Sequence, residues 1–492
     1  MNYRICSPCR IGFSMLSWSE SHEMVTKLAQ SSHMERSRSS SIINLVTGGD
    51  HMKRSERVLC VLPFLVCAFL FSGTAHGQSS ERPTNVQALI DSAKPGSTVQ
   101  LPPGLYEGPV VISKPLQLRG NEAQLVRASD APTDQPLLQV KASGVVVSGL
   151  ILQDDQTPLV LEGDANEVTN TSITSRQTAI KLINADHNLL QNLQIRGTEP
   201  ELNDRGHGIE LRQANDNRIE NSQFQFVQDG IYLEHSARNQ ISHNHITDSR
   251  YGVHLMFTER SRISDNLLER NVTGAMVMED VGSHILNNRI FKQSGHVHSQ
   301  GVLLYNVTHA SIANNLIADN RIGLYVDSST ANSILDNDIS NNFLGVLMTG
   351  ATDNELRGNV WSGNVVQAQA VDSSNNRLWA NFWDTHRGLD LNGDNLSELP
   401  YLASPFFLAL TDAVPAYQLF FQAPGFAVLE EMFTSKTDHW LQDTAPLLAA
   451  PDHPANEAQA EPLPKRVLFV SLLMLAAGIL PFWKNRIWRS SI

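Results

Sequence analysis

The sequence contains two stretches that stand 22 residues apart, Asp229-Gly230-Ile231-Tyr232-Leu233 and Tyr251-Gly252-Val253-His254-Leu255. In each stretch a glycine precedes an alternating run, with aliphatic residues at the first and third positions after the glycine. Successive side chains of a β-strand point to opposite faces, so this alternation indicates a strand with one buried face. The second position after each glycine then points outward.

The same unit recurs along residues 205–382 with a spacing of 22 residues, apart from one gap of 27. A polar residue, nearly always asparagine, follows each glycine by fourteen positions. A fixed period of this length indicates a solenoid, and short segments of period two exclude helical repeats. We therefore predict an all-β chain that forms a right-handed parallel β-helix of about 22 residues per coil. We expect the glycines at sharp turns and the asparagines stacked in a ladder. The glycines are Gly208, Gly230, Gly252, Gly274, Gly301, Gly323 and Gly345, and the polar residues are Ser222, Asn244, Asn266, Asn288, Asn315, Asn337 and Asn359.

The N-terminal part of the chain is predicted to be a targeting segment that is not part of the folded domain. Residues 52–77 have a basic start, a long apolar run and small residues at the end, which is typical of a secretory signal peptide. Residues 1–51 are then a mis-assigned or non-structural extension, with a genuine long leader as the alternative. All four cysteines lie before residue 78, so the exported chain has none. Its 29 basic and 45 acidic residues give a net charge of −16, which speaks against nucleic acid as a partner.

The remaining chain divides into four predicted parts. We expect a β-helix domain over residues 78–400, whose first coil is capped by a short helix near residues 85–93. Residues 401–444 are apolar and aromatic and predict short helices that cap the solenoid or dock on another surface. Residues 445–464 are rich in proline and alanine and predict a linker. Residues 465–492 hold a 17-residue apolar run between basic residues, which favours a tail anchor in the inner membrane over a buried helix.

Four soft or borderline metal ligands are predicted to share the outward face of the solenoid. By the alternation within each strand, His254 and Met276 fall on neighbouring coils, one above the other, and Met256 and Met278 stack beside them. We expect this face to be exposed. Imidazole and thioether groups together suit Cu(I), so the pattern predicts a Cu(I) site. The alternative is that the methionines only cover apolar surface or meet a partner protein.

The 27-residue gap places an insertion beside this face. The extra residues lie within 292–300 and include His296 and His298. An insertion in a solenoid becomes a loop at a coil corner, and loops on rigid scaffolds often carry function. The two histidines are therefore predicted to assist the metal site, with simple solvated side chains as the alternative.

An enzyme is the second interpretation of the same face. Many parallel β-helices act on acidic polysaccharides, and the outward positions include Glu210, Arg212 and Glu234. These groups fit a uronate lyase or epimerase, or a carbohydrate-binding strip. Arg212 and Glu234 on adjacent coils fit a surface ion pair equally well. Because we find no compact catalytic cluster, we predict a protein that is not an enzyme.

The chain resembles the NosD family of periplasmic accessory proteins of nitrous oxide reductase, over about residues 80–435. The motifs that carry the resemblance are Asp229-Gly230-Ile231-Tyr232, Tyr251-Gly252-Val253-His254, Gln300-Gly301-Val302-Leu303-Leu304-Tyr305-Asn306, Ala380-Asn381-Phe382-Trp383-Asp384 and the N-terminal Val86-Gln87-Ala88-Leu89-Ile90-Asp91-Ser92-Ala93-Lys94-Pro95-Gly96.

This resemblance implies a role in assembling the copper centres of the reductase. The implied partners are an ABC transporter, made of an ATPase and a membrane subunit, a copper-chaperone lipoprotein and the reductase itself. It also implies a periplasmic location and no catalytic activity. In this setting the Met/His face becomes a candidate transit site for Cu(I), and residues 401–444 become a candidate dock on the membrane subunit.

Overall fold

The computed structural model describes residues 84–403, 410 and 441–451. The predicted extension, signal peptide and tail anchor lie outside these residues, as do most of the segment 401–444 and of the linker. Among the described residues, no helix is long and apolar enough to cross a membrane.

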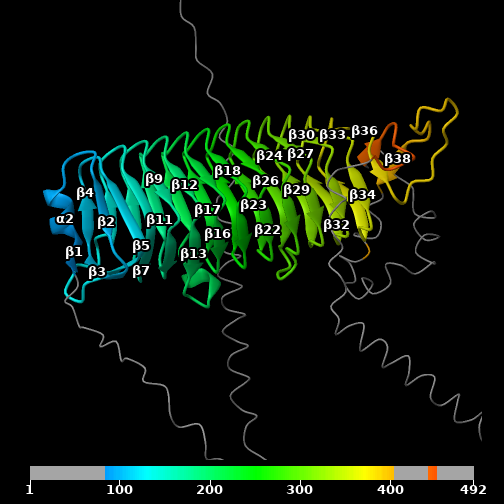
Figure 1. Cartoon of the computed structure of the whole chain (residues 1–492). Helices are drawn as coiled ribbons and strands as arrows, with labels where there is room; N and C mark the ends of the chain where they lie inside the picture. Colours follow the sequence, from blue (N-terminus) through cyan, green and yellow to red (C-terminus); the bar gives the residue numbers. More distant parts are fainter. Residues whose placement is uncertain (1–83, 404–409, 411–440, 452–492) are drawn as a thin grey trace, which may run out of the picture. The chain divides into compact units, whose positions relative to one another are not determined.

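The described chain is a parallel β-helix, which confirms the predicted fold class. Figure 1 shows its coils stacked in one row, in sequence order from blue to yellow. One face is a sheet of 12 strands, here called sheet B, and it carries the predicted site. Its strands are β4 (Val110–Ile112), β6 (Leu138–Val140), β8 (Leu159–Leu161), β11 (Ile180–Ile183), β14 (Ile209–Arg212), β17 (Asp229–Glu234), β20 (Tyr251–Met256), β23 (Thr273–Met278), β26 (Gln300–Tyr305), β29 (Ile322–Asp327), β32 (Leu344–Thr349) and β35 (Val366–Val371).

The remaining strands join in a second sheet of 27 strands, called sheet A. From β7 onward, two short strands of sheet A follow each strand of sheet B in most coils. They are β1 (Thr84–Asn85), β2 (Thr98–Leu101), β3 (Gly104–Gly108), β5 (Gln117–Arg127), β7 (Val146–Asp154), β9 (Glu167–Thr169), β10 (Ser172–Ser175), β12 (Leu189–Gln191), β13 (Gln194–Gly197), β15 (Arg218–Glu220), β16 (Gln223–Gln225), β18 (Gln240–Ser242), β19 (His245–Thr247), β21 (Arg262–Ser264), β22 (Leu267–Glu269), β24 (His284–Leu286), β25 (Arg289–Phe291), β27 (Ser311–Ala313), β28 (Leu316–Ala318), β30 (Ser333–Leu335), β31 (Asp338–Ser340), β33 (Glu355–Arg357), β34 (Val360–Ser362), β36 (Arg377–Trp379), β37 (Phe382–Trp383), β38 (Tyr401–Ala403) and β39 (Leu441–Asp443).

A continuous apolar core runs through the coils. The aliphatic residues predicted to point inward, such as Ile231, Leu233 and Val253, are fully buried. Met348 is also fully buried, as its inward position predicts. Parallel strands at a spacing of about 4.8 Å bring each of these side chains onto its counterpart in the next coil.

The predicted asparagine ladder is present at one corner of the coils. Asn288 is typical: its side-chain amide donates to the carbonyl of Ile263 (2.9 Å) and to Asn315 Oδ1 (3.0 Å). Its own Oδ1 accepts from the backbone N–H of Asn266 (3.0 Å). Each amide thereby satisfies backbone groups that a bend leaves without partners, which is why the position is nearly always asparagine.

The repeat glycines do not lie at sharp turns, contrary to the prediction. Gly230 and Gly252 lie inside strands β17 and β20, and neither has a positive φ. A Cβ atom at Gly252 would lie 2.4 Å from the carbonyl oxygen of Gly274, so the coils approach too closely there for any side chain. The tight corners instead use left-handed polar residues such as His243 and Asp265.

The first coil is capped as predicted. Helix α2 (Val86–Ser92) buries Val86 and Ile90 against the core. The side chain of Asn85 accepts from the N–H of Ala88 (3.2 Å) at the start of the helix. A helical cap covers the open edge of the solenoid, where unpaired strands would otherwise be exposed.

At the other end, most of the segment 401–444, with its predicted helices, lies outside the described residues. Its two described ends are strands, and β38 pairs antiparallel with β39. Asp443 accepts hydrogen bonds from Asn381 and Trp383, so residues far along the sequence close the last coil. A pairing between strands this far apart in the sequence leaves no periodic pattern from which it could be predicted. The loop at Asp390 is a turn in which the carboxylate accepts from the N–H of Gly393 (2.6 Å).

Candidate functional site

The predicted ligands lie on adjacent strands in the predicted register. His254 in β20 is the direct neighbour of Met276 in β23, and Met256 is the direct neighbour of Met278. All four side chains occupy outward positions of sheet B, and the three methionines are partly buried. The constant 22-residue period made this juxtaposition predictable.

His254 is not exposed, contrary to the prediction. Only 7% of its surface is accessible. Its ring lies between two tyrosines, with centroid distances of 4.9 Å to Tyr232 and 5.0 Å to Tyr251. Glu210, at the same position two coils earlier, is also buried. The outward face is thus covered locally by large side chains that stack along the coils.

Asp229 is the carboxylate behind this histidine, and sequence reasoning missed it. It is fully buried and accepts from Arg250 Nε and Nη2, both at 2.8 Å, and lies 3.0 Å from Nδ1 of His254. Burial alone would raise the pKa of Asp229, but the hydrogen bonds from His254 and Arg250 outweigh it and lower the pKa to about 2. Asp229 is therefore ionised at neutral pH.

An ionised carboxylate fixes the state of the His254 ring. Because a carboxylate only accepts hydrogen bonds, Nδ1 of His254 carries the proton that it shares with Asp229. In the neutral ring Nε2 then bears a lone pair. This Nε2 is buried, and among the described residues it has no hydrogen-bond partner. A buried acceptor of this kind is free to bind a ligand or a metal ion.

Two further aromatic residues complete the surroundings. The Tyr232 hydroxyl donates to the sulfur of Met256 (3.5 Å), and burial raises the pKa of Tyr232 to about 12, so the hydroxyl stays protonated. His207 stacks on Tyr232 at 5.0 Å and lies 3.4 Å from Asp229. Burial lowers the pKa of His207, which favours its neutral form despite the nearby carboxylate.

The histidine insertion forms a corner loop between β25 and β26, as predicted. His296 and His298 are exposed, and their rings lie 5.3 Å apart. The backbone N–H of His298 donates to Nδ1 of His296 (3.2 Å). Within the described part of the chain, the polar and ring contacts of both histidines stay inside this loop. The structure does not join them to the four residues on sheet B.

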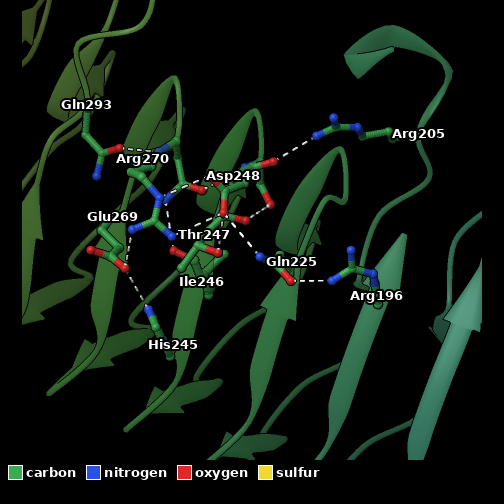
Figure 2. Close-up of polar contacts among 12 residues, drawn as sticks. Arg196, Arg205, Gln225, His245, Ile246, Thr247, Asp248, Glu269, Arg270 and Gln293 are labelled. Atoms are coloured by element: carbon green, nitrogen blue, oxygen red, sulfur yellow. Dashed lines mark hydrogen bonds and ion pairs between the residues drawn. The ribbon is translucent and has the colours of Figure 1, made fainter. Parts of the chain in front are cut away.

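A second insertion covers residues 198–206 and contains the 3₁₀ helix η1 (Leu202–Asp204). Hydrogen bonds hold it against the corner of the coil beside the site. Figure 2 shows Arg205 reaching the backbone oxygen of Asp248 (2.8 Å). The Asp248 carboxylate accepts from Arg270 (3.2 Å) and from Thr247 (2.9 Å). This network rigidifies the corner that leads into β20 and carries Arg250.

The groups that suggested a sugar site are largely engaged with one another. Arg212 lies 2.5 Å from Glu210 and 3.4 Å from Glu234, so the ion pair considered above is present. Lys181 lies 3.6 Å from the second oxygen of Glu210. Among the residues described, no group of three or more His, Cys, Asp or Glu side chains is arranged to hold a metal ion. A metal site here would thus rest on one imidazole and thioether sulfurs.

Residues 191–402 match the family model described as "Periplasmic copper-binding protein (NosD)". The NosD resemblance is confirmed. The matched range includes β17, β20 and β23, so the whole candidate site lies within the NosD-like part of the chain. The family description supports a periplasmic, copper-binding protein.

Solved structures similar to this chain include polysaccharide-acting enzymes. A family 28 exopolygalacturonase from Yersinia enterocolitica is 11% identical, with a TM-score of 0.47, covering 59% of this chain and 74% of its own. The alginate lyase AlyF-OU02 is 14% identical, with a TM-score of 0.48, covering 63% and 86%. The A-module of the Azotobacter vinelandii mannuronan C-5 epimerase AlgE6 is 15% identical, with a TM-score of 0.40, covering 61% and 90%. These likenesses carry no argument about activity. No curated protein matches the chain.

Proposed function

We propose that this protein is a periplasmic accessory protein that carries Cu(I) during assembly of the copper centres of nitrous oxide reductase. The observation that carries the proposal is the buried Nε2 of His254, which has no hydrogen-bond partner in the part of the chain that the structure describes and lies on the direct neighbour of Met276. The family description of the matched range supports copper as the cargo.

The chemistry of these side chains suits transfer of Cu(I). One neutral imidazole and the thioethers of Met256, Met276 and Met278 are soft or borderline ligands that favour Cu(I) over harder cations. The exported chain has no cysteine, so no thiolate competes for the ion. Thioethers carry no charge, which allows a partner with stronger ligands to remove the ion.

The proposed partners follow from the family resemblance. A copper-chaperone lipoprotein delivers Cu(I), and an ABC transporter, made of an ATPase and a membrane subunit, works with the β-helix during transfer to the reductase. Residues 401–444 are the proposed dock on the membrane subunit, and residues 465–492 the proposed tether to the inner membrane. His296 and His298 are proposed to assist transfer from their corner loop.

The direct test is a Cu(I) titration of the exported chain under anaerobic conditions, with a chromophoric chelator as competitor. We expect one Cu(I) per chain, lost when His254, Met256, Met276 and Met278 are all changed to Ala. The matched control changes Leu347 and Gln369, which occupy equivalent outward positions on β32 and β35 and are not neighbours of the four residues, to Ala. Unchanged binding in the fourfold variant, with native circular dichroism, would overturn the proposal.

The assembly role is tested in cells. Nitrous oxide reductase purified from cells that make the fourfold variant should contain less copper than reductase from cells that make the Leu347/Gln369 control. Equal copper content would show that the Met/His face plays no part in assembly.

A second candidate function is proton abstraction from a sugar acid. The observation that favours it is the Asp229–His254 pair beside the Tyr232 hydroxyl, because an oriented imidazole with a free Nε2 is also a general base. Incubation with uronate polymers tests it. Unsaturated products or a changed epimer ratio, lost in His254→Ala, would favour an enzyme over a copper carrier.

A further inference from the structure

Strand β17 contacts two of the four proposed ligands, although it supplies none itself. Its first residue, Asp229, bonds to His254, and its fourth, Tyr232, bonds to Met256. Both ligands belong to the next strand, β20. One coil thus supports the side chains of the coil above it.

We infer that Asp229, held by Arg250, is the positioning residue that presents Nε2 of His254 to Cu(I), and that Tyr232 does the same for the sulfur of Met256. This inference rests on the proposed function and names the residues that set the geometry of that site.

The first step of the argument is the tautomer. A neutral histidine carries its proton on either nitrogen, and only the Nδ1–H form leaves Nε2 free to bind a metal. The Asp229 carboxylate accepts at 3.0 Å from Nδ1 and thereby selects this form. Metal-binding histidines commonly use their second nitrogen in this way.

The second step is the rigidity of the carboxylate. Asp229 has no exposed surface, and both of its oxygens accept from Arg250. The Arg250 guanidinium in turn lies over the ring of Tyr251, 4.4 Å from its centroid. A two-point bond from a planar guanidinium fixes both the position and the orientation of the carboxylate. The orientation of the His254 ring is therefore determined by side chains that do not touch the metal position.

The third step concerns the thioether. The Tyr232 hydroxyl donates to the Met256 sulfur at 3.5 Å and occupies one of its two lone pairs. Methionine has three rotatable side-chain bonds, so an unrestrained sulfur samples many positions. The hydroxyl restricts this freedom and leaves the second lone pair for the ion. This contact is weaker than the one to His254, because sulfur is a weak acceptor.

The main test is Asp229→Asn, which keeps the shape of the side chain but can present its amide N–H to Nδ1. We expect affinity for Cu(I) to fall by about 10- to 100-fold, as for other changes to residues that hydrogen-bond a metal-binding histidine. X-ray absorption of the Cu(I) complex should show the nitrogen ligand lost and the sulfur ligands kept. The matched control is Asp280→Asn, another fully buried aspartate, whose carboxylate bonds only to Thr258 and Ser283 among the described residues.

A measurement without metal keeps the inference testable on its own. In protein labelled with ¹⁵N-histidine, the ring nitrogen shifts of His254 should report the Nδ1–H form in the native chain. They should report loss of that form in Asp229→Asn and no change in Asp280→Asn. If Asp229→Asn does not fold, Arg250→Gln is the alternative variant. It removes the two hydrogen bonds from Arg250 that hold the Asp229 carboxylate, and it should lower the affinity for Cu(I) by about tenfold or less.

The outcomes separate this inference from the proposed function. Native affinity and an unchanged nitrogen ligand in Asp229→Asn, beside lost binding in His254→Ala, would overturn the positioning role and leave the copper site standing. Native affinity in both His254→Ala and the fourfold variant would instead refute the copper site. For Tyr232→Phe we expect a two- to fivefold loss of affinity, about 0.4–1 kcal/mol in binding free energy, and no loss at all would remove Tyr232 from the inference.

Discussion

The two halves of the outer face of sheet B share one backbone and differ in their side chains. From β14 to β23, the residues at the second position after glycine are Glu210, Tyr232, His254 and Met276. From β26 to β32 they are Leu303, Tyr325 and Leu347. The strands of both halves pair in parallel with unbroken register.

The tyrosines illustrate the difference. Tyr232 donates to a methionine on the next coil. Tyr325 donates to Asp327 on its own strand (3.0 Å) and hydrogen-bonds Thr349 on the next coil. In the first half, the contacts between coils hold an imidazole and a thioether, whereas in the second half the contacts of the tyrosine join only hydroxyl and carboxylate groups. The comparison shows that the backbone scaffold is uniform. A candidate site forms only where outward side chains on successive coils contact one another and include metal ligands.

If the scaffold is uniform, breaking the ladder should cost the same in both halves. We expect Asn288→Ala and Asn337→Ala each to lower the free energy of unfolding by about 3 kcal/mol, because each leaves buried backbone groups without partners. Urea denaturation measures the cost. The control is Asn287→Gly, which changes an exposed neighbour with a positive φ and should be nearly neutral. Clearly unequal costs for the two ladder variants would contradict a uniform scaffold.

Acid should weaken the first half through Asp229. Its pKa of about 2 lies below the usual 3.8, so its ionised form stabilises the fold above pH 3.8 and this contribution is lost as the pH falls towards 2. The contribution is about 2 kcal/mol, from a shift of nearly two pH units. Urea denaturation of the native chain and of Asp229→Asn should therefore differ at pH 6, and the difference should shrink below pH 4 and vanish only at about pH 2 and below. A difference that does not change with pH would contradict the buried ion pair.

Methionine-to-leucine changes separate binding from packing. Met276→Leu and Met278→Leu should each weaken Cu(I) binding about tenfold, because leucine fills the space without a sulfur ligand. Met348→Leu, on the buried face of the second half, should leave binding unchanged. All three swaps nearly conserve volume and should cost less than about 1.5 kcal/mol of stability. Competition with a chelator and thermal melts report the two quantities.

The smallest effect is expected at the histidine loop. His296→Ala with His298→Ala should change the equilibrium affinity for Cu(I) by about twofold or less, a few tenths of a kcal/mol, because their polar and ring contacts, within the described chain, stay inside the loop. Stopped-flow measurement of Cu(I) transfer from a donor complex should show any role as slower uptake. A large loss of equilibrium affinity would place these histidines among the ligands themselves.

The features that could be predicted from the sequence are those that depend on the length of the repeat. A constant repeat determines which residues are neighbours on adjacent coils, so the pairing of His254 with Met276 and the asparagine ladder followed directly. It also placed the insertion with His296 at a corner. These features depend only on counting residues.

The rest depends on side-chain shape and on contacts outside the repeat. The burial of His254 results from tyrosine rings that lean across from neighbouring positions, and their rotamers are not encoded in the period. Asp229 was detectable in principle, since it directly precedes a repeat glycine and faces Tyr251 on the next coil. The pairing of β39 with β36 in the last coil joins strands far apart in the sequence, and no local sequence pattern indicates it.

The stacked coils also fix the distance between the candidate site and the C-terminal end of the β-helix. Five strand-to-strand steps separate β20, which carries His254, from β35 at the end of sheet B, and at about 4.8 Å each they span about 24 Å. The asparagine ladder ties successive coils together through hydrogen bonds and resists stretching of this distance. A partner bound at the C-terminal end of the β-helix therefore lies at a fixed distance from the proposed copper-binding position, and adding or deleting one 22-residue coil would change that distance by one step of about 4.8 Å.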